Sequence, residues 1–131
     1  MDKFLLVSAS DKGRQYLYDV VSSSDSVHID TVKTGGQARR QLLEQDEYDI
    51  IVINAPLTDE SGIELSIDFA TEHNSSIILL VKSESFEQIQ EYVENAGVYV
   101  VAKPINRQIF YSSLKYALIS RKKMLSLIEK Q

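Results

Sequence analysis

Short apolar stretches alternate along the chain with longer stretches in which apolar residues recur every three or four positions. The short stretches predict β-strands, and the longer ones predict amphipathic helices. The predicted strands are 3–7, 27–32, 49–53, 76–81 and 98–102. The predicted helices are 13–22, 36–45, 62–72, 86–95 and a last one from residue 106 to the end. Five strand-helix units in strict alternation predict an α/β class domain, a doubly wound (βα)5 fold with one five-stranded parallel sheet.

The central strands indicate where a functional site would lie. Three segments, IIVI, IILLV and VYVVA, are apolar on both faces, as expected for parallel strands covered by helices on each side. In open sheets of this kind, ligands bind at the carboxyl ends of the strands. The positions that follow the predicted strands are therefore the candidates for chemistry. They are residues 8–11, 54–59, 81–83 and 103–104.

Composition narrows the possible functions. The chain has 131 residues, is 44% hydrophobic, and contains no cysteine and two histidines, so we expect one globular domain without disulfides or a cysteine or histidine metal cluster. No apolar run approaches the ~18 residues of a membrane span, and we expect a cytoplasmic protein with no membrane partner.

Charge is unevenly placed along the chain. Residues 1–105 carry 8 basic and 18 acidic side chains, whereas residues 106–131 carry 6 and 1. An acidic body argues against a compact nucleic-acid-binding domain. Two interpretations of the basic terminal segment stay open: it has a separate role, or it is an ordinary helix whose lysines and arginines face solvent.

Two segments resemble the CheY-like receiver domains of bacterial response regulators. YDIIVINAPLTDESGIEL is similar to the phospho-acceptor strand and its loop, and VAKPIN is similar to the Lys-Pro at the end of the fifth strand. The resemblance covers residues 1–120 and implies a flavodoxin-like fold. It also implies a chemistry: a nucleophilic aspartate, an acidic pair that completes a Mg²⁺ site, a Thr or Ser that contacts the phosphoryl group, and a lysine.

The acceptor and metal positions of that family carry other residues here. The acceptor position is Asn54, whose neutral amide cannot act as the carboxylate nucleophile. The acidic pair falls on Ser8 and Ala9. Magnesium is held by hard oxygen ligands, usually carboxylates, which a hydroxyl, a methyl group and an amide do not supply. We therefore expect a degenerate receiver with no metal, no cofactor, no catalytic residue and no aspartyl phosphate.

Of the remaining positions of the family pattern, two carry other residues here and two keep the family's residues. The Thr or Ser position falls on Val81 and the aromatic switch position on Val100, while Lys103 and Pro104 are retained. We expect Lys103 to donate to the Asn54 side chain, the Ser8 hydroxyl or loop carbonyls. Two alternatives stay open: a regulator phosphorylated through unusual ligands, and a sensor domain in which Lys103 binds a small anion or metabolite.

The last predicted helix is longer than the sheet requires. As one helix, residues 106–131 would span ~39 Å, whereas a five-residue strand spans ~17 Å. An apolar stripe along this helix, interrupted by Arg121, has alternating spacings of four and three, which are typical of a coiled-coil seam. The candidate seam and flanking residues are Phe110, Leu114, Ala117, Leu118, Met124, Leu125 and Ile128. The alternative is a helix end that folds back or frays.

The expected function is that of a pseudo-receiver, a signalling domain rather than an enzyme. We expect residues 1–120 to form the receiver-like domain and residues 121–131 to form a helical linker to an output domain. The expected mechanism is homodimerisation through the fourth helix, the fifth strand and the fifth helix with its extension. The tail resembles that of ANTAR antiterminators, which implies that RNA would be contacted only through the output domain. Candidate residues for the dimer face are Phe86, Tyr92, Tyr99 and Tyr116.

Overall fold

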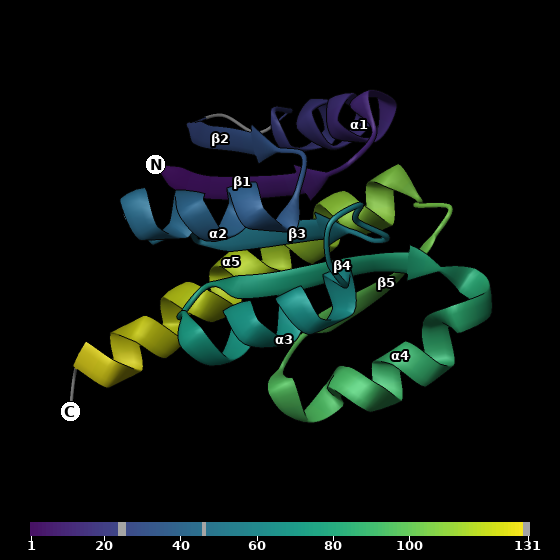
Figure 1. The fold of residues 1–131 in the computed structure, drawn as a ribbon. Coiled ribbons are helices and arrows are strands. Elements are labelled where there is room, and N and C mark those ends of the chain that lie inside the picture. Colours follow the sequence, from purple (N-terminus) through teal and green to yellow (C-terminus); the bar gives the residue numbers. More distant parts are fainter. Residues whose placement is uncertain (24–25, 46, 130–131) are drawn as a thin grey trace.

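A computed structural model describes residues 1–23, 26–45 and 47–129, and it confirms the predicted fold. Within these residues, five parallel strands form one sheet in the order β2-β1-β3-β4-β5 (Figure 1). The strands are β1 (Asp2–Ser8), β2 (Val27–Val32), β3 (Ile50–Asn54), β4 (Ser76–Lys82) and β5 (Tyr99–Lys103). The central position of β3 explains why its apolar residues 50–53 are all buried.

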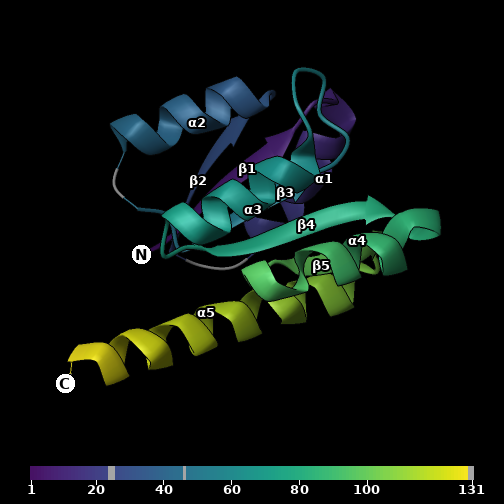
Figure 2. The same cartoon turned by 60° about the horizontal axis from the view of Figure 1, so that its bottom comes forward.

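Helices cover both faces of the sheet (Figures 1 and 2). One face packs against α2 (Gly35–Glu44), α3 (Gly62–Glu72) and α4 (Phe86–Val93), and the other packs against α1 (Asp11–Val21) and α5 (Arg107–Glu129). The predicted fourth helix is shorter than expected, because a 3₁₀ turn (Glu94–Ala96) follows Val93. Gly97 then adopts the left-handed conformation at φ 79°. No described helix has both the length and the apolar character needed to cross a membrane.

The structure corrects the predicted seam of the terminal helix at two positions. Phe110 and Leu114 are 1% and 3% exposed and belong to the core cluster between α5 and the sheet, so they cannot form a seam with another helix. Ala117 and Leu118 are half-buried against the same cluster. The apolar stripe found in the sequence is therefore the core-facing side of α5 over its first three turns. This side of α5 packs on the sheet because the sheet offers it a large apolar surface to bury against.

Beyond the sheet, α5 is anchored by a buried arginine. Arg121 is 8% exposed, and its guanidinium donates to the carboxylate of Asp49 at 3.1 Å and to the carbonyl of Asn74 at 3.2 Å. The carboxylate of Glu47 lies 3.7 Å from the same group. These partners come from the segments that precede β3 and β4, at the N-terminal end of the sheet. An arginine that sequence periodicity places in a coiled-coil stripe thus holds α5 to the body of the domain.

The expected boundary after residue 120 falls inside α5. Arg121 and Lys122 still contact the body, Lys122 through an ion pair of 3.3 Å with Asp2. The later residues of the helix run past the N-terminal end of the sheet, as Figure 2 shows. Residues 130 and 131 of the expected linker lie outside the described residues.

The Arg121 anchor predicts a position-specific loss of stability. Replacing Arg121 with Ala should lower the free energy of unfolding by roughly 2 kcal/mol, because Asp49 loses a charged donor in a poorly solvated place. The neighbouring substitution Lys122→Ala removes an exposed pair and should change stability by less than about 0.5 kcal/mol. Urea denaturation of both variants measures the difference. Equal losses would contradict the anchoring role of Arg121.

Candidate functional site

The parallel sheet brings three polar residues together at its C-terminal edge. Ser8 ends β1, Asn54 ends β3 and Lys103 ends β5, and Ser8 is paired in register with Asn54. The carboxyl ends of parallel strands share one edge of a sheet, which places these side chains around a common point.

A chain of hydrogen bonds connects these three side chains. The Lys103 ammonium donates to the side-chain oxygen of Asn54 at 2.8 Å and to the carbonyl of Ala55 at 2.6 Å. The Asn54 amide nitrogen donates to the hydroxyl of Ser8 at 3.1 Å, and Ser8 is fully buried. Asn54 and a loop carbonyl are two of the three acceptors expected for Lys103. Each polar group is satisfied without a negative charge.

Within the described part of the chain, no carboxylate pairs with Lys103. Burial lowers the pKa of Lys103 below its ordinary value of 10.5, and the nearby charge of Lys82 lowers it further. Both causes disfavour the ammonium form. The hydrogen bonds to Asn54 and Ala55 keep the group in place despite this penalty.

Arg14 is a part of the site that the sequence reasoning missed. Its guanidinium donates to the carbonyls of Ser8 and Ala9 at 2.9 and 3.2 Å, and its side chain is 14% exposed. It also pairs with Asp11, in the first turn of α1. A fixed cation from α1 therefore holds the end of β1. The sequence signal was an arginine one helical turn after the N-cap Ser10, a position from which its side chain can reach back to the preceding loop.

Gly13 allows α1 to approach the site. A Cβ atom at this position would lie 2.8 Å from the Ser8 hydroxyl oxygen, 2.7 Å from that of Ser10 and 3.0 Å from the Asn54 amide nitrogen. Any side chain would push α1 away from Ser8 and Asn54. The space beside these groups is thus closed by backbone.

The loop between β3 and α3 is fastened to α2. The carboxylate of Asp59 accepts hydrogen bonds from the backbone N–H groups of Gly35 and Gly36, both at 2.9 Å, and these bonds lower its pKa. Glu60 accepts from Arg39 at 2.8 Å. The two acidic residues of the loop serve as a cap and an ion-pair partner for the neighbouring helix.

The switch-equivalent positions belong to the apolar core. Val81 and Val100 are 2% and 6% exposed and lie in the cluster between the sheet and helices α2, α3 and α4. Neither offers a hydroxyl that could contact a phosphoryl group or change partners. Pro104 is exposed and follows Lys103 through a cis peptide bond.

Comparison with known families matches the model of the response regulator receiver domain to residues 4–115. The chain belongs to this family. A comparison with curated proteins finds no significant match.

Several solved structures share the receiver fold. An adenylate cyclase from Rhodopirellula baltica matches 98% of this chain and 95% of its own, with a TM-score of 0.85 and 19% identity. A CheY-like response regulator receiver domain protein from Methanospirillum hungatei JF-1 matches 95% and 98%, with a TM-score of 0.83 and 17% identity. The signal receiver domain of an HD domain-containing protein from Pseudomonas fluorescens Pf-5 matches 93% and 98%, with a TM-score of 0.82 and 21% identity. At these identities the likeness shows the fold alone.

The donor set at this edge of the receiver sheet does not fit a magnesium ion. Ser8 and Asn54 offer a hydroxyl and an amide, Ala9 offers a methyl group, and the Ser8 and Ala9 carbonyls already accept from Arg14. Magnesium dehydrates reluctantly and is usually held through one or two carboxylates. Among the described residues, no three Asp, Glu or His side chains gather where they could share a metal ion.

The candidate residues for the dimer face differ in exposure. Tyr92, Tyr99 and Tyr116 are 63%, 56% and 74% exposed, whereas Phe86 is half-buried against the core. Tyr92 donates a hydrogen bond to Glu64 at 2.6 Å and so connects α4 with α3. In the outer part of α5, Leu125 is half-buried, and Met124 and Ile128 are exposed.

The lowered pKa of Lys103 predicts a pH dependence of stability. Between that lowered pKa and 10.5, the unfolded chain binds more protons than the folded one, so stability from this group rises with pH. The stability of wild type relative to Lys103→Met should therefore increase as the pH rises towards 10.5. Urea unfolding at pH 7 and at pH 10 measures the difference.

The substitution Lys82→Met serves as the control for this effect. It removes the charge that helps to lower the pKa of Lys103, so the pH-dependent gain should become smaller. If instead the stability of wild type relative to Lys103→Met fell as the pH rose, Lys103 would have a raised pKa and an unrecognised anionic partner.

Proposed function

We propose that this protein is a pseudo-receiver, a signalling domain that acts through protein contacts without accepting a phosphoryl group. The observation that carries the proposal is the neutral partner of Lys103. Its ammonium is bound by an amide oxygen and a backbone carbonyl, where the family places a nucleophilic carboxylate. An amide nitrogen shares its lone pair with the carbonyl, and an amide oxygen is a poor nucleophile, so Asn54 cannot form the acyl phosphate.

The surroundings of Asn54 support a domain held in one state. Arg14 fixes the end of β1, Asp59 and Glu60 fasten the loop after β3, and Val81 and Val100 lie in the core. A conformational switch requires an element with two arrangements of similar free energy and a ligand that distinguishes them. The site offers satisfied hydrogen bonds and closed packing instead.

Without a phosphorylation switch, the proposed output is self-association through α4, β5 and α5. Exposed aromatic residues on β5 and α5 support this assignment, since Tyr99 and Tyr116 each leave more than half of their surface in solvent. Dimerisation would set the spacing of an output domain joined through α5. The resemblance of the tail implies an ANTAR-type RNA-binding domain as the output, and a cytoplasmic setting suits such a role.

A second candidate is a small-anion sensor. Lys82 lies close enough to Lys103 to lower its pKa, so two ammonium groups border the site. An anion there would gain from both charges. Stabilisation by phosphate or sulfate that is lost in Lys103→Met would favour the sensor over the pseudo-receiver.

Phosphoryl transfer provides the direct test. We expect the intact mass of the protein to stay unchanged after incubation with acetyl phosphate and Mg²⁺. Asn54→Asp alone should also stay unlabelled, because Ser8 and Ala9 supply no carboxylate for the metal.

The combined variant Ser8→Asp, Ala9→Asp and Asn54→Asp is the positive control. It restores the nucleophile and the acidic pair together, and we expect Mg²⁺-dependent labelling. Mg²⁺-dependent labelling of wild type, mapped to any residue of the site, would contradict the proposed function.

A further inference from the structure

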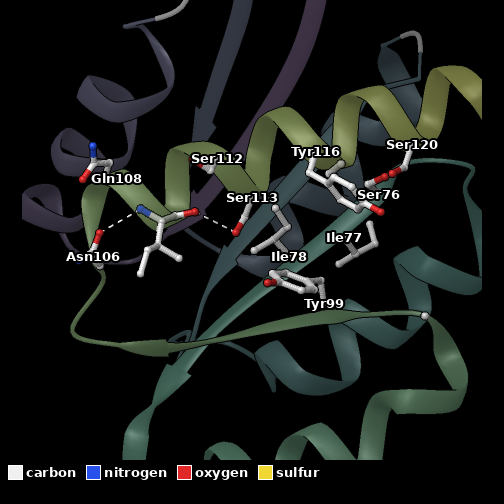
Figure 3. Close-up of a pocket in the computed structure, with 13 residues that line it drawn as sticks. Ser76, Ile77, Ile78, Tyr99, Asn106, Gln108, Ser112, Ser113, Tyr116 and Ser120 are labelled. Carbon is white, nitrogen blue, oxygen red and sulfur yellow. Dashed lines mark hydrogen bonds between the residues drawn. The ribbon is translucent and has the colours of Figure 1, made fainter.

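Two of the hollows in the described surface differ in the residues that line them. The larger, of about 970 Å³, lies between α5 and the starts of β4 and β5, and Figure 3 shows its walls. None of its described lining residues is Asp, Glu, Lys or Arg, so no charged group is present there to select a ligand. The smaller, of about 510 Å³, is lined by several charged side chains. It is called the basic pocket below.

The basic pocket lies at the C-terminal end of the edge strand β2. It is lined by Arg14 of α1, by the end of β2 with Lys33, and by Gln37, Arg40 and Glu44 of α2. The α2 residues are spaced three and four apart, so they share one face of that helix. Because α1 and α2 cover opposite faces of the sheet (Figure 1), the pocket opens across the edge of β2.

Positive charge gathers in the basic pocket although the body of the domain is acidic. Residues 1–105 contain 8 basic and 18 acidic side chains. Three of these basic side chains, Arg14, Lys33 and Arg40, line the pocket, and among its described lining residues Glu44 is the one acidic side chain. A concave surface lined mainly by one sign of charge concentrates ions of the opposite sign. The pocket therefore attracts anions on a protein whose net charge repels them.

Two of the three cations are available to a ligand. Within the described ranges, the Lys33 ammonium and the Arg40 guanidinium make no ion pair or hydrogen bond. The neighbouring Arg39 differs, because it pairs with Glu60 and Asp68 at 2.8 Å each. A guanidinium without a carboxylate partner can bind two phosphate oxygens through parallel N–H groups, and an ammonium adds a point charge.

Arg14 and Gln37 are already held in place at the basic pocket. The Arg14 side chain is 14% exposed and donates to the carbonyls of Ser8 and Ala9. The side-chain oxygen of Gln37 accepts from the backbone N–H of Lys33 at 2.8 Å, so the group that it can offer a ligand is its NH₂. Groups that are fixed before binding lose little freedom when a ligand arrives, which favours a specific site over a diffuse positive surface.

Glu44 indicates a ligand that is more than a bare anion. It ends α2, whereas Lys33 precedes this helix, so the carboxylate and the ammonium border different ends of the pocket. A carboxylate accepts hydrogen bonds from hydroxyl groups and repels phosphate oxygens. The volume of 510 Å³ lies within the ~300–1,000 Å³ of small-molecule sites. These features match a molecule with a phosphate at one end and hydroxyl groups at the other.

We propose that the basic pocket binds a small phosphate monoester that carries hydroxyl groups, either a sugar phosphate or the ribose phosphate of a nucleotide. Lys33 and Arg40 bind the phosphate, Arg14 adds a third positive charge, and Glu44 accepts from the hydroxyl groups. The inference goes beyond the proposed pseudo-receiver function. It depends neither on self-association nor on the strand-end site around Lys103.

Calorimetric titration of the full chain with ribose 5-phosphate and with AMP tests the site. Lys33→Gln with Arg40→Gln should raise the dissociation constant of either ligand by about tenfold or more, because each side chain supplies charge-assisted hydrogen bonds. Lys12→Gln with Lys123→Gln removes the same charge outside the pocket and should change it by less than about twofold. All four side chains are exposed, so folding should be preserved. Tighter binding of AMP would identify a nucleotide, and equal binding a sugar phosphate.

Inorganic phosphate serves as a further probe, because it separates the role of Glu44 from that of the cations. Wild type should bind ribose 5-phosphate several-fold more tightly than inorganic phosphate, since only the sugar brings hydroxyl groups to the carboxylate. Glu44→Met should reduce this preference several-fold. An unchanged preference would overturn the assigned class of ligand.

Three results would overturn the site itself. The first is no binding of any probe at millimolar concentration. The second is an equal loss in the two double variants, which would show a non-specific effect of charge. The third is a loss in Lys103→Met but not in Lys33→Gln with Arg40→Gln, which would place the anion at the strand ends. Phosphoryl labelling tests the pseudo-receiver separately, so failure of this inference leaves that proposal standing.

Discussion

The ammonium group of Lys103 is the constraint on which the functional edge of this domain depends. A buried cation requires oxygen acceptors, and here both are neutral: the Asn54 amide and the Ala55 carbonyl. Once the partner of Lys103 is an amide, no excess negative charge remains at the strand ends that would require a divalent cation. The position of Ser8 can then carry a hydroxyl in place of a carboxylate, and Arg14 can bind the carbonyls at the end of β1. A neutral partner for Lys103 is thus consistent with the hydroxyl of Ser8 and with the position of Arg14.

The same logic connects the site with the rest of the domain. A conformational switch requires an element with two arrangements, whereas the loop after β3 is fastened to α2 through Asp59 and Glu60. At the opposite end of the sheet, Arg121 fastens α5 through Asp49 and Asn74. Both ends of the fold are therefore fixed by charged groups that pair within the domain. A domain built in this way can present α5 in one constant direction, which suits a scaffold better than a switch.

The strands, the helices and the strand-end residues could be predicted from the sequence, because apolar periodicity and parallel topology place Ser8, Asn54 and Lys103 at one edge. The role of Arg121 could not, because it depends on Asp49 and Asn74, which only the folded chain brings near. Arg14 binds the nearby carbonyls of Ser8 and Ala9, and its only signal was its position one helical turn after Ser10. The terminal helix shows a different limit. Apolar residues cover more than half of its circumference, because neighbours such as Ile109 and Phe110, or Leu127 and Ile128, point in different directions from the helix axis. Periodicity alone therefore does not tell which stripe the sheet will cover.

The most direct test of the central claim is a heteronuclear NMR titration of the protein with Mg²⁺ and beryllofluoride, a mimic of the phosphoryl group. If the pocket has lost its chemistry, the backbone amide signals of Asn54, Ala55, Val81 and Lys103 should stay at their original positions up to the highest concentrations of both that can be reached. Concerted shifts of these signals that disappear in Lys103→Met would contradict the account, because they would show that the site still binds and responds to a phosphoryl group.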